Sequence, residues 1–464
     1  MLNGQEAGDV MLEAHQAGIT TRREKIKIIL ALAVPTMIEN FLLTIVGFID
    51  TLFVSRIGLN EVAAVGVGNT VIAVYIALFM ALGIGTSSLI ARAVGAGDFT
   101  KAKAIARQST WISAFTGLLL GIVSLFFAES ILRLMGAAPD ILAHGVVYFQ
   151  IVAVPSLFIS LMAIFGSILR SGGDTRTPMV VGIWVNLIHI VLDYVLIFGI
   201  GSWQGWGIAG AGWATSIVRV IGTVVLYKYI QQSKLSFSLF KKQSAQSYTY
   251  PLLTLSLPAA AERLIMRVGQ MFYLGLVIRI STEVYSAHLI AGNVIALSYL
   301  PGYGLAVAAT TLVGQQLGAG RTRDSYEYGL LTAWIAVVFM TLIGIVFWLG
   351  SGIAASWFTG DIVIVEMVRT ALGIDAFAQP FLAISLVIAG ALQGAGDTKS
   401  PMYSTIIGIW GIRVLGIYVL CLHFQMGIAG VWLVSAIDQL MRSVYLLQRF
   451  KSRLQAKQTI AQGE

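Results

Sequence analysis

The chain has 464 residues, of which 57% are hydrophobic and 11% charged, and it carries a formal net charge of +8. Because soluble domains have roughly a quarter of their residues charged, this composition excludes a soluble globular protein. Long apolar stretches alternate with short polar links, and each stretch can cross about 30 Å of hydrocarbon as a helix. The sequence lacks short alternating strands, which argues against a closed barrel. We therefore predict an all-α membrane protein with twelve transmembrane helices.

The order of polar and apolar stretches predicts the domains. Residues 1–27 carry charges of both signs and lack the short apolar core of a cleaved signal, so we expect a cytoplasmic tail. An N lobe is predicted at 28–232 and a C lobe at 251–450. A polar, basic cytoplasmic linker is expected between them at 233–250, and a second cytoplasmic tail at 451–464.

The positive charges favour one orientation in the membrane. When twelve helices are threaded from a cytoplasmic N-terminus, most Lys and Arg residues of the links fall on the side of that terminus. Arg56, Arg133 and Arg279 fall on the other side. This asymmetry follows the positive-inside rule and accounts for the net charge without nucleic acid. We expect a multi-pass protein of the cytoplasmic membrane with both termini in the cytoplasm.

The sequence repeats itself at an offset of 223 residues, the separation of Pro35 and Pro258. An even number of helices separates equivalent links, so the two copies run in the same direction. This predicts two six-helix lobes that are related by a pseudo-two-fold axis along the membrane normal and enclose a cleft. The matching segments are Pro35 and Glu39 with Pro258 and Glu262, Gly95–Gly97 with Gly318–Gly320, and Gly173–Met179 with Gly396–Met402.

Five motifs in this order resemble the multidrug and toxic compound extrusion (MATE) family across nearly the whole chain. They are VPTMIENFLLTIVGFIDTLFVSRIG in helix 1, the link AVGAGD, NLIHIVLDYVLIFG in helix 5, and the pair LRSGGDTRTP and LQGAGDTKSP. The resemblance implies a twelve-helix antiporter with an N and a C lobe. Such a protein expels organic cations or other amphipathic compounds by alternating access, driven by inward protons or sodium ions.

Asp50 is the first candidate functional residue. It lies inside an apolar helix, where an ionised carboxylate is costly. The i, i+4, i+7, i+11 spacing places it on the same helix face as Glu39. It matches the helix 1 aspartate of the family. The alternative reading is that Asp50 caps the helix or forms a hydrogen bond near its end.

Helix 5 carries a second group of polar residues on one face, because Asn186, His189 and Asp193 follow i, i+3, i+7 spacing. The resemblance implies that Asp193, Asp50 and Thr215 of helix 6 form the ion site of the N lobe, either for a proton or for Na⁺. His189 stands where many relatives have asparagine, which adds a titratable group and argues against a site for sodium alone. Alternatively, His189 forms a hydrogen bond to a neighbouring helix.

Several further residues are predicted to contact substrate. Glu39 and its repeat Glu262 could attract cationic compounds across the cleft. Alternatively, Arg267 pairs with Glu262 about one helix turn away. The adaptable side chains of an apolar pocket are predicted at Met37, Met266, Tyr273 and Tyr299, although such residues are more often ordinary packing. Pro35 and Pro258 are expected to bend their helices.

The two copies differ where coupling is expected. Asp50 becomes Tyr273 in the second copy, which predicts that the coupling site lies in the N lobe. Some relatives bind sodium in the C lobe through helices 7 and 10, but the equivalent positions here are Met266 and Leu382, which offer no oxygen ligand. Asp375 lies nearer the outer end of helix 10, where a solvated role is as good an interpretation.

Enzyme function finds no support in the sequence, because GxSxG, HExxH, GxxxxGK and CxxC elements are all missing. The single cysteine, Cys421, provides neither an intrachain disulfide nor a cysteine-based metal site. We predict a monomeric efflux antiporter that needs no cofactor beyond its coupling ion, with small-molecule substrates and lipid as its partners. The alternatives are a lipid flippase of the wider superfamily and, less favoured, an ion channel.

Overall fold

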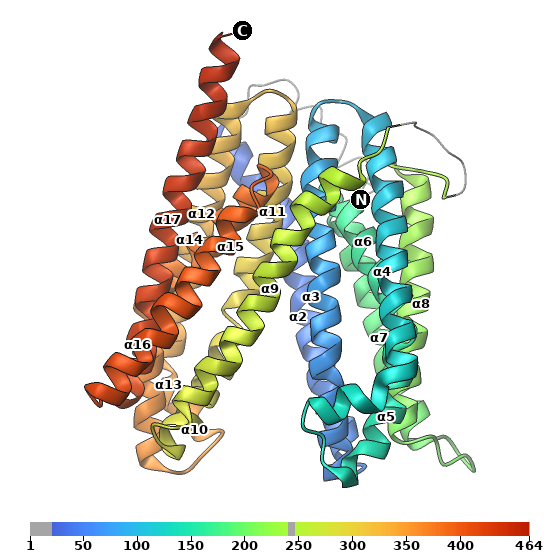
Figure 1. The fold of residues 1–464 in the computed structure, drawn as a ribbon, viewed down its shortest axis with the longest axis vertical. Helices are drawn as coiled ribbons and strands as arrows, with labels where there is room; N and C mark the ends of the chain where they lie inside the picture. Colours follow the sequence, from blue (N-terminus) through green and yellow to red (C-terminus); the bar gives the residue numbers. More distant parts are fainter. Residues whose placement is uncertain (1–20, 240–245, 464) are drawn as a thin grey trace. The chain divides into compact units, whose positions relative to one another are not determined.

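The computed structural model describes residues 21–239 and 246–463 (Figure 1). Residues 1–20 of the predicted tail at 1–27, residues 240–245 of the predicted linker and residue 464 lie outside the described residues. Within these ranges the chain forms helices and no named strand, and an isolated bridge joins Ile200 and Trp203. The prediction of an all-α fold is confirmed.

The chain divides into two compact units. Of the described residues, unit 1 takes Ile38–Ala93 and Asp98–Ala260, and unit 2 takes Val94–Gly97, Ala261–Glu464 and the residues up to Met37. Two long helices therefore belong to both units. Helix α2 (Arg22–Ser55) changes unit two residues after Pro35, and α9 (Thr249–Val277) changes unit two residues after Pro258. Both helices continue through their proline.

Unit 1 is a bundle in which α8 is the central partner. Helix α8 packs against α5, α6 and α7, and α4 packs against both helices of the bent pair α5 and α6. This pair turns by 46° around Pro155. Besides the later part of α2, the helices are α3 (Leu59–Gly95), α4 (Phe99–Leu134), α5 (Pro139–Ala153), α6 (Ser156–Ser171), α7 (Arg176–Phe198) and α8 (Ile208–Gln232).

Unit 2 is built around α14, which packs against most of its other helices. Its helix before the last contains two π-helical segments, η1 and η2, which are unusual in proteins and common at functional sites. Besides the later part of α9, the elements are α10 (Thr282–Ala296), α11 (Tyr299–Gly318), α12 (Thr322–Leu349), α13 (Ser351–Ser356), α14 (Ile362–Gly394), α15 (Lys399–Ile406), η1 (Ile407–Val414), α16 (Leu415–Ile417), η2 (Tyr418–His423) and α17 (Gly427–Gly463).

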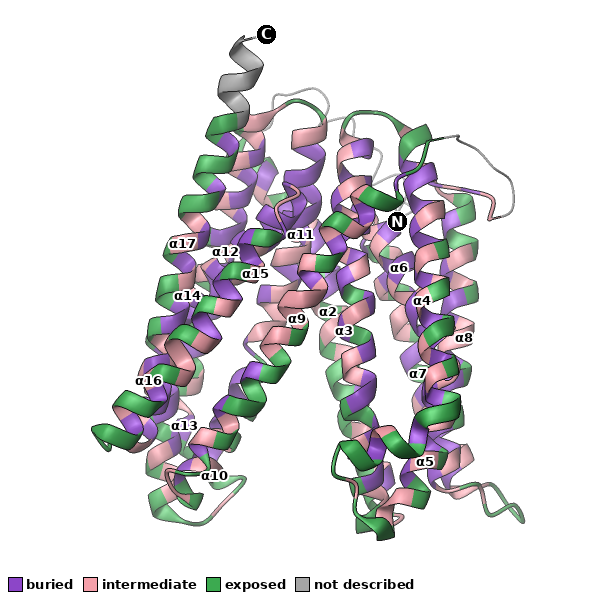
Figure 2. Ribbon diagram, in the orientation of Figure 1, coloured by how far each residue is buried: buried purple, intermediate pink, exposed green. Residues whose placement is uncertain are grey.

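The membrane spans agree with the predicted twelve helices. Among the described residues, 8 helices are long and apolar enough to cross a membrane, and the bent pairs α5–α6 and α10–α11 raise the number to 10. The two long helices that remain, α9 and α17, carry charged residues in their middle parts. Many large apolar side chains face outward, such as Phe115 and Phe126 of α4, which are 69% and 73% exposed (Figure 2). Lipid is the solvent that suits these faces.

The repeated GDT motif starts a helix in each copy. Asp174 Oδ1 accepts a hydrogen bond from the Thr177 amide at 2.9 Å, and Asp397 Oδ1 accepts one from the Ser400 amide at the same distance. These carboxylates satisfy amides that have no partner within the helix. Gly173, at φ +97°, makes the turn that precedes the first of these helices. The GDT motif is therefore explained in both copies by the turn that it forms before a helix.

An ion-pair cluster joins η1 to α17 in unit 2. Asp438 is fully buried and pairs with two guanidinium groups, Arg413 Nε at 2.5 Å and Arg442 Nε at 2.6 Å. Arg442 also donates to Thr405 Oγ1 at 3.2 Å. Gly408 of η1 lies so close that a Cβ atom there would collide with Asp438 Oδ1 and Arg442 Nε. The cluster therefore depends on a glycine at this position.

We expect Gly408→Ala to lower the stability of the protein, because the added methyl group pushes against the buried ion pair. The expected cost is about 1–3 kcal/mol. Gly411→Ala, three residues later in η1, is the matched control, since its methyl group would meet only Ile407 Cγ2 at 3.9 Å. Thermal unfolding of the purified protein in detergent measures both variants. Equal midpoints for the two would contradict the proposed packing.

Candidate cation site

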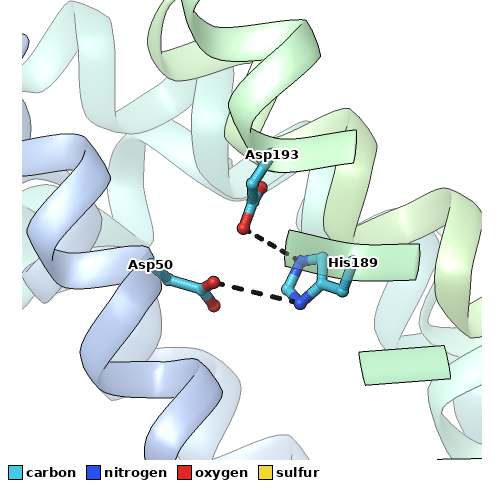
Figure 3. Close-up of side chains that lie close together, drawn as sticks. All are labelled: Asp50, His189 and Asp193. Carbon is cyan, nitrogen blue, oxygen red and sulfur yellow. Dashed lines mark ion pairs between the residues drawn. The ribbon is translucent and has the colours of Figure 1, made fainter. Parts of the chain in front are cut away.

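The structure brings together three ionisable side chains from two helices of unit 1. His189 Nδ1 lies 3.9 Å from Asp50 Oδ1 of α2, and His189 Nε2 lies 3.5 Å from Asp193 Oδ2 of α7 (Figure 3). One potential ligand atom from each residue lies within 4.8 Å of the other two. Figure 3 shows the two carboxylates on the same side of the imidazole, each facing a different ring nitrogen. We call Asp50, His189 and Asp193 the central cluster.

Helix geometry sets most of this arrangement. His189 and Asp193 are separated by four residues on α7, so their side chains project from the same face. Helix α8 packs along α7 and supplies Thr215, whose Oγ1 lies 3.2 Å from His189 Nε2. The sequence predicted each of these residues from spacing and resemblance. The structure adds that the imidazole contacts both carboxylates.

The hydrogen bonds of Thr215 constrain the proton on His189. Thr215 Oγ1 donates to the Ala211 carbonyl at 2.9 Å, so its hydroxyl hydrogen is already used. His189 Nε2 must then carry a proton to donate to Thr215 Oγ1. In a neutral imidazole this leaves Nδ1 as an acceptor, facing the Asp50 carboxylate. A proton on either Nδ1 or Asp50 turns that contact from repulsive to attractive.

The carboxylates of the central cluster are short of partners. His189 and Asp193 are buried and Asp50 is partly buried. Asp50 Oδ1 and both oxygens of Asp193 accept no hydrogen bond within the part of the chain that the structure describes. Two nearby carboxylates in apolar surroundings cannot both stay ionised at low cost unless a cation joins them. The arrangement is therefore suited to bind and release a cation.

The residue types decide which cations fit. Asp50, Asp193 and Thr215 offer the oxygen ligands that a hard cation such as Na⁺ prefers. The imidazole beside the carboxylates offers nitrogen, which suits hard cations poorly and protons well. Asn186 is buried one turn before His189, and its Nδ2 has no hydrogen-bond partner among the described residues. It remains a predicted member of the site.

Sequence reasoning missed three residues around the central cluster. Tyr148 of α5 donates to Asn69 of α3 at 3.1 Å, and its ring is buried. Arg219 of α8 acts electrostatically on Tyr148, His189 and Asp50. Arg219 could have been predicted from the sequence, because it is a charged residue within an apolar helix and follows the predicted site residue Thr215 by one helix turn. Neither Asn69 nor Tyr148 had such a signal.

The predicted substrate carboxylates have protein partners. Glu39 pairs with Arg170 of α6, Oε2 to Nη1, at 3.1 Å. Glu262 accepts a hydrogen bond from Thr405 at 3.3 Å, while its Oε2 is buried without a hydrogen-bond partner in the described chain. The expected pairing with Arg267 is not among the described ion pairs, and Arg267 is exposed. The substrate roles of Glu39, Glu262 and Arg267 stay predictions.

The other predicted substrate residues lie in varied surroundings. Met37 packs against Gly304 of α11, whereas Met266 is half-buried. Tyr273 is buried, 5.4 Å from the His288 ring, and the Arg413 guanidinium lies 5.9 Å from its centre. Tyr299 contacts the ring of Tyr303 at 6.3 Å.

Asp375 Oδ2 of α14 accepts a hydrogen bond from Gln379 Nε2 at 2.5 Å. The side chain is half-buried and its partner is fully buried. The sequence left open that Asp375 is solvated; in the structure its carboxylate is hydrogen-bonded to Gln379.

Comparison with known proteins agrees with the repeat and the fold. The MatE family model matches residues 35–195 and again residues 258–419, one match for each copy. The chain belongs to the MatE family. A probable multidrug resistance protein NorM of Thermotoga maritima is 32% identical over 450 residues, covering 96% of this chain and 95% of the relative. The multidrug resistance protein PmpM of Pseudomonas aeruginosa is 29% identical over 399 residues, covering 84% and 83%.

Solved structures of this MatE-type fold superpose well. One is an outward-facing multidrug resistance MATE family transporter of the MOP superfamily, with a TM-score of 0.87, 24% identity and coverage of 93% of this chain and 96% of the other. Another is a MOP superfamily transporter from Pyrococcus furiosus, with the same TM-score and identity and coverage of 94% and 97%. At this identity the likeness establishes the fold, a twelve-helix architecture with two lobes.

The Glu39–Arg170 pair allows a test of its structural role. We expect Arg170→Met to destabilise the protein by about 1–3 kcal/mol, because it leaves the mostly buried Glu39 carboxylate without its guanidinium partner. In Glu39→Gln/Arg170→Met that penalty should shrink, which gives a coupling of about 1 kcal/mol or more in a double-mutant cycle. The stabilities are measured by unfolding of the purified variants. Additive effects of the two substitutions would argue against the pair.

Proposed function

We propose that this MatE-family protein is a cation-coupled multidrug efflux antiporter, driven by protons in preference to Na⁺. It would expel amphipathic, often cationic, organic compounds by alternating access. In this proposal the protein lies in the cytoplasmic membrane as a monomer with both termini in the cytoplasm, and it uses no cofactor beyond the coupling ion. The names of the relatives NorM and PmpM as multidrug resistance proteins support this class of substrate.

The observation that carries the proposal is the central cluster with its unpartnered carboxylate oxygens. Three other carboxylates in the described helices have close partners, and Glu262 accepts a hydrogen bond from Thr405 at one of its two oxygens. Asp438 pairs with two arginines, Glu39 pairs with Arg170, and Asp375 lies against Gln379. Asp50 Oδ1 and the oxygens of Asp193 lack hydrogen bonds. An exchangeable cation is therefore needed most in unit 1.

The geometry of His189 favours the proton over Na⁺. With Nε2 donating to Thr215, Nδ1 is the nitrogen that can take up a proton, and it lies 3.9 Å from Asp50 Oδ1. A sodium ion at the same place would lose the oxygen ligands of its hydration shell and gain a protein ligand shell that includes the imidazole nitrogen, which binds Na⁺ poorly. The proton needs no such shell.

Coupling would follow from the charge of the central cluster. A proton that enters from outside neutralises one carboxylate, and α2, α7 and α8 can then pack more closely around it. The rearranged bundle would bind a cationic substrate less tightly, so the substrate leaves outward. When the proton is released inward, the negative charge returns and the next substrate binds.

We expect Asp50→Asn and Asp193→Asn each to abolish gradient-driven efflux of ethidium from proteoliposomes, because neither amide can take up the coupling proton. Asp375→Asn is the matched control: it also changes a carboxylate in an apolar helix, but one that already lies against Gln379. It should retain efflux. Size-exclusion profiles would verify that all three variants are folded. Efflux at the wild-type rate in both Asp50→Asn and Asp193→Asn would refute the assignment.

Separate gradients distinguish the coupling ions. In vesicles that contain wild-type protein, a pH gradient without sodium should drive ethidium transport, and a sodium gradient at equal pH should not. Transport that responds to sodium alone would overturn the preference for protons.

A further inference from the structure

Arg219 is a charged residue in the middle of α8 that the proposed transport cycle does not use. Helix α8 is one of the apolar spans, and Arg219 lies eleven residues from its start. Its Nη1 atom is buried and has no hydrogen-bond partner among the described residues. A guanidinium in an apolar helix is costly when even one of its nitrogens is buried without a partner, so its presence needs an explanation.

The arginines of unit 2 that lie in apolar helices show the usual solution. Arg413 and Arg442 hold Asp438 at 2.5 Å and 2.6 Å, so each charge has an opposite charge in direct contact. The same is true of Arg170 with Glu39 in unit 1. Among the described ion pairs Arg219 has no such direct contact.

The groups around Arg219 come from four helices. Its charge interacts with Asp50 of α2 and with the Tyr148 hydroxyl of α5, and it also acts on His189 of α7. Thr215, one turn before Arg219 on α8, contacts His189 directly. Arg219 therefore belongs to the surroundings of the central cluster without forming an ion pair to it.

We propose that Arg219 is a tethered counter-cation that keeps metal ions out of the central cluster. This inference rests on the proposed function of the cluster as the coupling site. A guanidinium is always charged and cannot leave, so it permanently offsets part of the charge of the cluster through Asp50. With a neutral imidazole, the two ionised carboxylates and Arg219 together carry one negative charge.

The remaining single charge treats protons and metal ions differently. A proton neutralises it by binding to one oxygen and needs no further ligands. A sodium ion must lose its water, find several oxygens and stay near the guanidinium charge, which repels it. Two like charges in this partly buried setting repel by roughly the equivalent of a tenfold change in affinity or more. Arg219 thus determines the cation specificity of the site.

The test is direct binding of Na⁺ to the purified full chain in detergent at pH 8, measured by isothermal titration with sodium chloride against choline chloride. Arg219→Met removes the charge and keeps the length of the side chain, and Arg219→Lys keeps the charge. We expect the methionine variant to bind Na⁺ at least about tenfold more tightly than wild type. The lysine variant should behave as wild type does, and Asp50→Asn added to Arg219→Met should remove the gain.

Two results would overturn the inference: Na⁺ binding by Arg219→Met that is no tighter than binding by the wild type, or an equal gain in Arg219→Lys. Arg219→Gln is a second neutral variant and decides the question if Arg219→Met does not fold. Because binding is measured without any gradient or substrate, the result does not depend on transport. Loss of the antiporter proposal would instead appear as gradient-driven efflux retained in Asp50→Asn and Asp193→Asn.

Discussion

A carboxylate inside an apolar helix bundle needs compensation for its charge, and several acids of the described chain obtain it in different ways. Asp438 has two guanidinium groups, Glu39 has one, and Asp375 lies against an amide. Such arrangements are fixed, because every partner is part of the chain. The carboxylates of Asp50 and Asp193 lie near each other, and their contacts to His189 are long, at 3.9 Å and 3.5 Å. Compensation there can come from outside the chain, which is what a coupling site requires.

The two copies of the repeat keep their frame and differ in their charges. The GDT links cap a helix in each copy with the same 2.9 Å hydrogen bond, because the turn geometry is common to both. At the position of Asp50 the second copy has Tyr273, which lies beside the guanidinium of Arg413. Unit 2 thus has a tyrosine beside an arginine where unit 1 has a carboxylate. In our proposal that carboxylate and Asp193 leave a net negative charge beside Arg219, which an exchangeable cation can neutralise.

Sequence reasoning reached the helices and the shared face of His189 and Asp193 through short-range periodicity, whereas the family resemblance implied that Asp50 joins Asp193 and Thr215. His189 and Asp193 lie on one face of α7 whatever the rest of the chain does. Partners between distant helices follow no such rule. Glu39 and Arg170 are 131 positions apart, and nothing in either segment indicates that they meet. The same holds for the pairing of Asp438 with Arg413, which lies on a different helix, and for the orientation of Arg219.

Helix α2 can transmit a movement at Asp50 to the other end of the same helix. The helix runs unbroken from Arg22 to Ser55, and its residues up to Met37 belong to unit 2 while Asp50 belongs to unit 1. At its start, Lys25 is held by Asp324 at 2.7 Å and by Glu327 at 2.6 Å, both on α12 of unit 2. From Lys25 to Asp50 an α-helix rises about 38 Å. Any movement of α2 that follows cation binding at Asp50 must therefore be absorbed near Pro35, where one hydrogen bond of the helix is missing, or be passed to the end anchored by Lys25.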